Sequence, residues 1–262
     1  MLTYTTSGDA RRPTVLFLHG FMGSAADWSE TMAALEDRFY CIAANLPGHG
    51  GSLGLPYPES YTIESAAKEL IDLLDDLNVS KAVVVGYSMG GRLALYFGLR
   101  HPERCAALFL ESASPGLETE PEREARRETD EKRAKRLETE DFETFLEDWY
   151  RQPLFASLAR DEELLCRTIE ARRKNDPGEL AKSLRGMGTG SQPSLWEELA
   201  GLRAPALAVA GELDEKYIEI AHRMADAGPG LRYATTSDAG HNPRVEASEA
   251  YLALLQDFLH SL

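Results

Sequence analysis

The chain has 262 residues, of which 43% are hydrophobic, and this is enough for one α/β domain with an insertion and a substantial core. Its 43 acidic residues outnumber 28 basic ones, and the net charge of −15 disfavours binding to nucleic acids and to anionic lipid surfaces. The first residues do not resemble a signal sequence, and no segment reaches transmembrane length. We therefore expect a cytoplasmic, soluble protein without nucleic-acid binding or membrane insertion, as a monomer or small homo-oligomer.

Short apolar runs alternate with helical patterns in the first part of the chain. An edge strand is expected at residues 2–6, followed by three buried strands at residues 14–18, 40–46 and 82–85. Residues 62–77 have apolar side chains at helical spacing, and residues 106–111 form another apolar run. Strands that alternate with helices in this way are typical of a mostly parallel sheet flanked by helices.

The alternation stops near residue 113 and resumes with a strand that begins at residue 205. The segment between them is heavily charged and reads as helical. Such an insertion lies over the carboxyl ends of the core strands, where ligands of α/β proteins bind. We therefore predict an α/β core formed by residues 1–112 and 200–262, with a helical lid formed by residues 113–199.

The motif Gly86-x-Ser88-x-Gly90 lies between the predicted strand at residues 82–85 and a helix that follows it. Glycines on both sides of the serine allow a tight strand-to-helix turn, which lifts the Ser88 hydroxyl clear of the sheet. The Met89 amide then opens the helix and can donate to a developing oxyanion. A second donor is expected from the Phe21 amide, in the glycine-rich turn after an earlier strand.

Two further residues complete a catalytic triad in the prediction. His241 follows a glycine near the end of the chain, and Asp214 comes just after a predicted strand. A histidine can take the proton of Ser88, and an acid on its other ring nitrogen fixes the tautomer. Glu212 and Asp238 are the local competitors of Asp214. The order serine, acid, histidine is that of α/β-hydrolases.

Arg92 lies four residues after Ser88 on the same predicted helix. Residues at this spacing share a helix face, and long side chains lean towards the helix start, so the guanidinium can reach the space above the serine. A protein with net charge −15 needs such local positive charge if its substrate is an anion. The alternative is an arginine that points into solvent or pairs with a core acid.

Residues 86–92, 115–117, 187–196 and 239–242 resemble 2-succinyl-6-hydroxy-2,4-cyclohexadiene-1-carboxylate synthases (SHCHC synthases), which have the α/β-hydrolase fold. The resemblance implies a triad of Ser88, Asp214 and His241. It also implies pocket positions for five side chains, which are Tyr87, Arg92, Arg126, Trp149 and Arg173. Arg127 and Arg172 become the alternatives if the register of the lid differs by one residue.

The members of the family that the chain resembles are carbon–oxygen lyases of menaquinone biosynthesis. Their substrate, 2-succinyl-5-enolpyruvyl-6-hydroxy-3-cyclohexene-1-carboxylate, is a tricarboxylate that loses pyruvate by elimination, with Ser88 as the implied base and no metal or organic cofactor. A carboxylester or thioester hydrolase with Ser88 as nucleophile is the alternative, and a non-catalytic binding protein is a third class. The hydrolase would need an apolar acyl pocket where arginines are expected.

Overall fold

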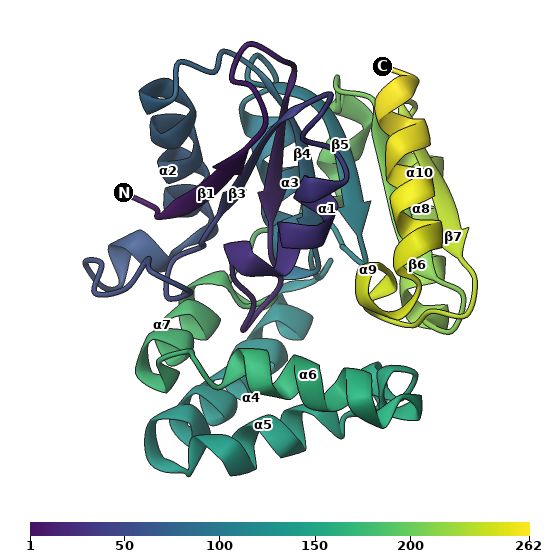
Figure 1. The fold of residues 1–262 in the computed structure, drawn as a ribbon. Coiled ribbons are helices and arrows are strands. Elements are labelled where there is room, and N and C mark those ends of the chain that lie inside the picture. The colour runs from purple at the N-terminus through teal and green to yellow at the C-terminus, as the bar shows by residue number, and fades with distance from the viewer.

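The computed structural model describes residues 1–262 and contains a seven-stranded sheet with helices on both faces (Figure 1). The strand order is β1-β3-β2-β4-β5-β6-β7, and all neighbours are parallel except β1, which pairs antiparallel with β3. The strands are β1 (Tyr4–Ser7), β2 (Thr14–Leu18), β3 (Tyr40–Ala44), β4 (Ala82–Tyr87), β5 (Cys105–Glu111), β6 (Ala206–Gly211) and β7 (Leu231–Thr236). The predicted fold class is confirmed.

The alternation of side chains along each strand builds a separate core on each face of the sheet. Leu16 and Leu18 belong to one apolar cluster, whereas Val15 and Phe17 belong to the other, because successive side chains of a strand point to opposite faces. The first cluster is covered by α2 (Ile63–Asp76), α3 (Met89–Arg100) and α8 (Glu215–Ala227). The second is covered by α1 (Ser29–Ala33) and α10 (Ser248–His260).

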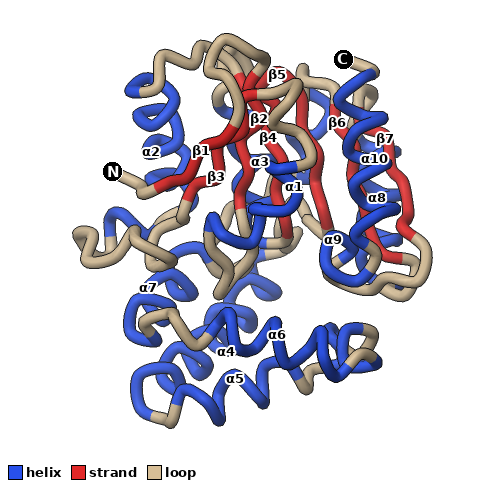
Figure 2. Tube along the Cα trace, viewed as in Figure 1, coloured by secondary structure: helices blue, strands red, loops and turns tan.

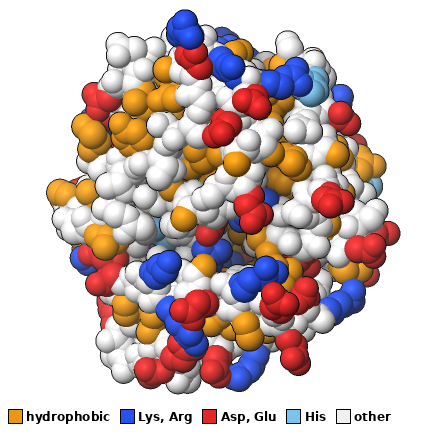
Figure 3. All heavy atoms as spheres, viewed as in Figure 1, with side chains coloured by type: hydrophobic (Ala, Val, Ile, Leu, Met, Phe, Trp, Pro, Cys, Tyr) orange, Lys and Arg blue, Asp and Glu red, His pale blue; other side chains and the backbone are white.

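Four helices between β5 and β6 form a helical insertion, and Figure 2 shows them as a layer without strands below the sheet. They are α4 (Glu120–Thr139), α5 (Phe142–Tyr150), α6 (Glu162–Arg172) and α7 (Pro177–Met187). The insertion has an apolar cluster of its own, which Met22 from the loop after β2 joins. Positive and negative side chains are interspersed over the face of the insertion that Figure 3 shows.

The helices of the insertion end at Met187, before the boundary at residue 199 that the sequence analysis predicts. Gly188, Gly190 and Pro193 follow, and residues 188–195 form turns and loop because glycine and proline disfavour a helix. The chain returns to the core through a short 3₁₀ helix, Trp196–Gly201, and a further short helix, α9 (Pro243–Glu246), precedes α10. None of the helices combines the length and apolarity needed to cross a membrane.

Candidate active site

Ser88 occupies the sharp turn between β4 and α3 with φ of 50°, a left-handed conformation that is unfavourable for a serine. The turn is possible because its neighbours lack side chains. A Cβ on Gly86 would lie 2.4 Å from the Gly90 carbonyl oxygen, and one on Gly90 would lie 2.2 Å from that of Leu18. The motif therefore forms the strained elbow that the sequence predicts, and Ser88 remains partly exposed.

Two hydrogen bonds connect Ser88, His241 and Asp214. His241 Nε2 lies 3.2 Å from Ser88 Oγ, and His241 Nδ1 lies 2.8 Å from Asp214 Oδ2. The histidine is 2% exposed and the aspartate 9%, so both are shielded from water. Glu212 and Asp238 are exposed, and a hydrogen bond from the Asp238 amide joins them to each other. The geometry thus favours Asp214 over both competitors as the partner of His241.

Two backbone amides have free donors beside the serine. The Phe21 N–H donates to no protein atom, and Met89 is the first residue of α3, so its N–H has no acceptor within the helix. The loop that carries Phe21 is fixed by the next residue, Met22, whose N–H donates to His49 Nε2 at 3.1 Å. Burial lowers the pKa of His49 well below its ordinary value, which keeps the ring neutral and able to accept.

Arg92 points from α3 into the interior and is only 8% exposed. Its Nη1 donates to Gln192 Oε1, and its Nη2 donates to the Met187 carbonyl at 2.8 Å. Neither the solvent-facing alternative nor a pairing with a core acid is observed. Burial lowers the pKa of Arg92 to about 10, so the guanidinium is still charged near neutral pH.

A cavity of about 270 Å³ opens above the serine between the sheet and the insertion. Ser88, His241, Phe21 and Met89 are part of its wall. Five positively charged side chains also line it: Arg92, Arg126, Arg133, Arg172 and Lys216. Asp27 is the one acid among the lining residues. A molecule of net charge −15 therefore has a cationic cavity over the hydrogen-bonded residues Ser88, His241 and Asp214. No group of three or more His, Cys, Asp or Glu side chains could hold a metal ion.

A family profile described as alpha/beta hydrolase fold matches residues 13–247. A relative from Bacillus subtilis (strain 168), named a putative SHCHC synthase, is 37% identical over 95% of this chain and 90% of its own. The SHCHC synthase of Enterobacter sp. (strain 638) is 32% identical over 97% of this chain and 95% of its own. This chain belongs to the α/β-hydrolase family, in its SHCHC synthase branch.

Two solved structures show the same relationship in three dimensions. MenH from S. aureus superposes with a TM-score of 0.94 at 32% identity, covering 100% of this chain and 99% of that one. A thermophilic esterase from Thermogutta terrifontis superposes with a TM-score of 0.87 at 26% identity, covering 99% and 93%. The SHCHC synthase branch and the esterases thus share one architecture. The fold alone does not distinguish the two activities, so the residues that line the cavity have to.

Three of the pocket residues implied by the resemblance to SHCHC synthases do line the cavity alongside Arg92. Tyr87 is buried, with its ring 5.7 Å from that of His241, and Trp149 stacks on Phe145 at 5.9 Å. Arg126 is placed by α4, whose start is fixed by a capping box between Thr119 and Glu122. Its Nε donates to Asp130 Oδ1 at 2.8 Å.

Arg173 corrects the sequence analysis, because it does not line the cavity. Its side chain is 49% exposed and pairs on the surface with Glu143 and Glu170. Arg172, the alternative one residue earlier, lines the cavity in its place and is 7% exposed. Adjacent residues of a helix lie about 100° apart, so only one of the two can face inward from the end of α6.

Sequence reasoning missed Arg133, Lys216 and Asp27. The signal for Arg133 was available, because it lies seven residues after Arg126 on one helix and therefore on the same face. Lys216 lies in the first turn of α8, two residues after Asp214, and it lines the same cavity as His241. For Asp27 the sequence offers only a local capping pattern with Ser24, which does not predict its distant partner.

Proposed function

We propose that this protein is a pyruvate-eliminating lyase that converts 2-succinyl-5-enolpyruvyl-6-hydroxy-3-cyclohexene-1-carboxylate into 2-succinyl-6-hydroxy-2,4-cyclohexadiene-1-carboxylate. The observation that carries this proposal is the pairing of a Ser88–His241–Asp214 hydrogen-bond chain with five cationic side chains around one cavity. A substrate with three carboxylates needs that charge. The names of the relatives from Bacillus subtilis and Enterobacter support the same reaction.

In this proposal Ser88 acts as a base rather than as a nucleophile. His241 Nε2 takes the Ser88 proton as the serine oxygen removes the ring proton next to the succinyl ketone. Asp214 orients His241 and stabilises its charged form. The ketone oxygen then carries the negative charge as an enolate, and the free amides of Phe21 and Met89 are available to hold it.

The electrons of the enolate return through the ring double bond and expel the enolpyruvyl oxygen. The carbon–oxygen bond to the ring breaks, a second ring double bond forms, and the released enolate takes up at its methylene carbon the proton that His241 holds, which gives pyruvate. Arg92, Arg126 and Arg172 are assigned to the substrate carboxylates, because all three line the cavity and a charged guanidinium donates strong hydrogen bonds to a carboxylate. They hold the trianion so that the acidic ring proton faces Ser88.

The second candidate is a carboxylester or thioester hydrolase, which would use Ser88 as nucleophile with the same triad. The likeness to the Thermogutta terrifontis esterase favours keeping it. Its acyl pocket should be apolar, whereas the cavity is lined by four arginines and a lysine. Charge in the cavity therefore supports the lyase.

Pyruvate release from the cyclohexene tricarboxylate, coupled to NADH oxidation by lactate dehydrogenase, tests the two functions beside hydrolysis of p-nitrophenyl acetate. We expect rapid pyruvate release and slow ester hydrolysis. Efficient turnover of the ester without any pyruvate release would reject the lyase and favour the hydrolase.

The role of Ser88 has a separate test. Ser88→Ala should lower kcat by several powers of ten, because it removes the base at the reacting atom. Intact-protein mass spectrometry of the wild-type protein during turnover should find no substrate-derived adduct. A covalent adduct on Ser88 that forms and decays at the catalytic rate would instead assign it as a nucleophile.

A further inference from the structure

Asp27 is out of place in a cavity that we assign to a trianion. It lies in the short 3₁₀ helix Ala25–Trp28, just after the loop that carries the Phe21 amide, and its side chain is 11% exposed. It is the one acid among the residues that line the cavity. A carboxylate there repels the carboxylates of a substrate unless a positively charged group pairs with it.

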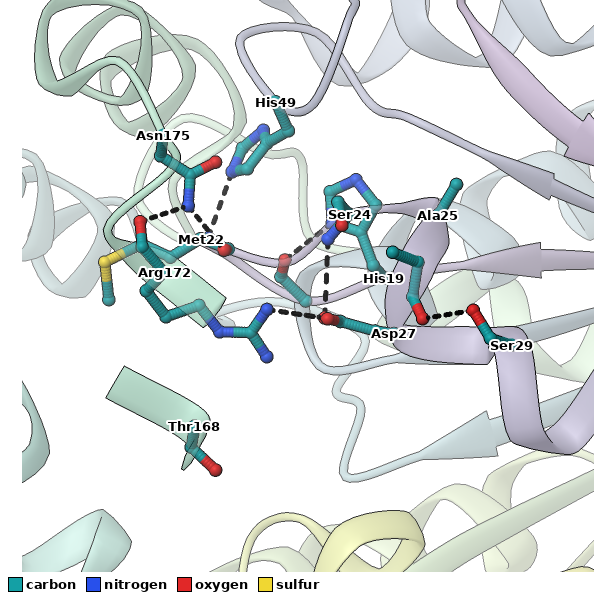
Figure 4. Close-up of polar contacts among 12 residues, drawn as sticks. His19, Met22, Ser24, Ala25, Asp27, Ser29, His49, Thr168, Arg172 and Asn175 are labelled. Carbon is teal, nitrogen blue, oxygen red and sulfur yellow. Dashed lines mark hydrogen bonds and ion pairs between the residues drawn. The ribbon is translucent and has the colours of Figure 1, made fainter. Parts of the chain in front are cut away.

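The negative charge of Asp27 is paired with the guanidinium of Arg172 (Figure 4). Arg172 Nη1, from the end of α6, donates to Asp27 Oδ1 at 2.7 Å and to Oδ2 at 2.8 Å. Arg172 Nε donates to the Tyr150 hydroxyl at 3.3 Å. Nη2 donates to no protein atom, so it is the one nitrogen of this guanidinium left for a ligand. Asp27 and Tyr150 thereby determine which edge of the Arg172 guanidinium faces the cavity.

Asp27 and Arg172 each shift the pKa of the other, because both side chains are largely shielded from water. Burial alone would raise the pKa of Asp27, but the charge and hydrogen bonds of Arg172 outweigh burial and lower it below its ordinary value. Burial alone would lower the pKa of Arg172, and Asp27 raises it instead. Both groups are therefore ionised near neutral pH, and removing either one leaves an unpaired buried charge.

A second contact fixes the same end of α6 without any charge. Asn175 Nδ2 donates to the Met22 carbonyl at 2.8 Å and to the Arg172 carbonyl at 3.0 Å (Figure 4). Met22 is the residue after Phe21, and its backbone has φ of 62°. The insertion is thus attached to the loop of the Phe21 amide at Asn175, independently of Asp27. Loss of the Asp27 charge should leave α6 attached to this loop.

We propose that Asp27 is a positioning residue that holds Arg172 with Nη2 directed at one carboxylate of the substrate. The proposal deepens the proposed lyase function and rests on it for the identity of the anion. The proposal predicts that deleting this negative charge from an anion site weakens binding of the anion. Simple charge repulsion predicts the opposite.

The test compares four proteins: wild type, Asp27→Asn, Arg172→Gln and the double variant. For pyruvate release, Asp27→Asn should raise KM at least tenfold and change kcat less than threefold. In the Arg172→Gln background the same change should lower KM, because the carboxylate then only repels the substrate. This reversal of sign is not expected of a purely structural role, which would lower kcat and the unfolding temperature in both backgrounds.

Glu30→Gln is the matched control. Glu30 is exposed on α1, three residues after Asp27, and its side chain makes no ion pair or hydrogen bond, so this variant should keep the wild-type KM. If Arg172→Gln fails to fold, Arg172→Lys replaces it, since an ammonium keeps the charge but loses the fixed Nη2 edge. Asp27→Asn should then raise KM less in the Arg172→Lys background than in wild type.

Calorimetric titration with tricarballylate, a small tricarboxylate, separates this proposal from the proposed function. If wild type binds tricarballylate but releases no pyruvate, the lyase reaction is wrong, and the sign of the Asp27→Asn effect on Kd still decides the role of Asp27. An Asp27→Asn variant that binds the anion more tightly than wild type would overturn the positioning role. A wild-type protein that neither binds tricarballylate nor releases pyruvate would overturn both.

Discussion

Asp214 has two contacts at the residue scale, and they can be separated by a single substitution. Its Oδ2 lies 2.8 Å from His241 Nδ1, and its Oδ1 accepts from the Tyr217 N–H at 3.4 Å, which caps the start of α8. Asparagine caps a helix as well as aspartate does, but its amide cannot stabilise the charged imidazole. The helix start and the hydrogen bond to His241 should therefore respond differently to Asp214→Asn.

We predict that Asp214→Asn lowers kcat for pyruvate release by about a thousandfold or more, with little change in KM or in the unfolding temperature. Asp238→Asn is the control, because Asp238 is exposed and asparagine tolerates its φ of 57°. Steady-state kinetics and thermal unfolding of both variants check this. If Asp238→Asn has the large effect and Asp214→Asn does not, the acid of the triad is misassigned.

The adjacent arginines at the end of α6 give a second prediction at this scale. Arg172→Gln removes a charged group from the cavity and should lower kcat/KM by about 30- to 1000-fold, equivalent to about 2 to 4 kcal/mol. Arg173→Gln removes only surface ion pairs and should stay within about twofold of wild type. Equal losses in the two variants would show that α6 does not present Arg172 alone to the substrate.

At the scale of elements, the loop after α7 positions a side chain that belongs to the core helix α3. Gln192 is fully buried, and its Oε1 accepts from Arg92 Nη1 while the Met187 carbonyl accepts from Nη2. Gly116 approaches the other side of Gln192 so closely that a Cβ there would lie 2.9 Å from Nε2. The loop that connects the insertion to the core is therefore packed closely around the hydrogen bond between Arg92 and Gln192.

We predict that Gln192→Ala lowers kcat/KM for the tricarboxylate by about 10- to 100-fold, the range expected for loss of a hydrogen bond to a charged group. Labelling of Ser88 by a fluorophosphonate should continue at the wild-type rate, since Ser88, His241 and Asp214 make no hydrogen bond with Gln192. A matching loss in labelling rate would mean that the substitution disturbs the elbow rather than Arg92.

At the scale of the whole molecule, one buried acid makes stability depend on pH. Glu111 ends β5 and is fully buried, with Oε1 accepting from the Arg244 N–H at 2.9 Å. Burial raises its pKa from 4.5 to about 7, although Arg244 opposes the shift. The folded state therefore binds more protons than the unfolded state between these values, and the stabilisation is lost as pH rises through about 7.

We predict that wild type loses about 2 to 3 kcal/mol of unfolding free energy between pH 5 and pH 8 relative to Glu111→Gln. Glutamine keeps an oxygen to accept from Arg244 but cannot ionise. Urea unfolding of both proteins at the two pH values measures the difference, from which other titrating groups cancel. Parallel pH profiles would mean that Glu111 is not the group responsible.

The fold class, and the proximity of Ser88, His241 and Asp214, could be predicted from sequence features. Apolar runs, glycine-flanked turns and the order of Ser88, Asp214 and His241 are such features, and parallel strands bring their carboxyl ends to one edge whatever lies between them. The reach of Arg92 towards Ser88 was equally local, because one helical turn separates the two. These inferences needed only short-range geometry.

Which of the two adjacent arginines at the end of α6 meets the cavity, and which residue it pairs with there, could not be identified without the three-dimensional structure. Arg172 rather than Arg173 faces inward because of how α6 packs against the loop after β2, and neither residue differs from the other in local sequence signal. The partner of Arg172 is Asp27, 145 residues away along the chain, and no periodicity connects them. Such contacts depend on how separately formed layers pack together, which local propensity does not specify.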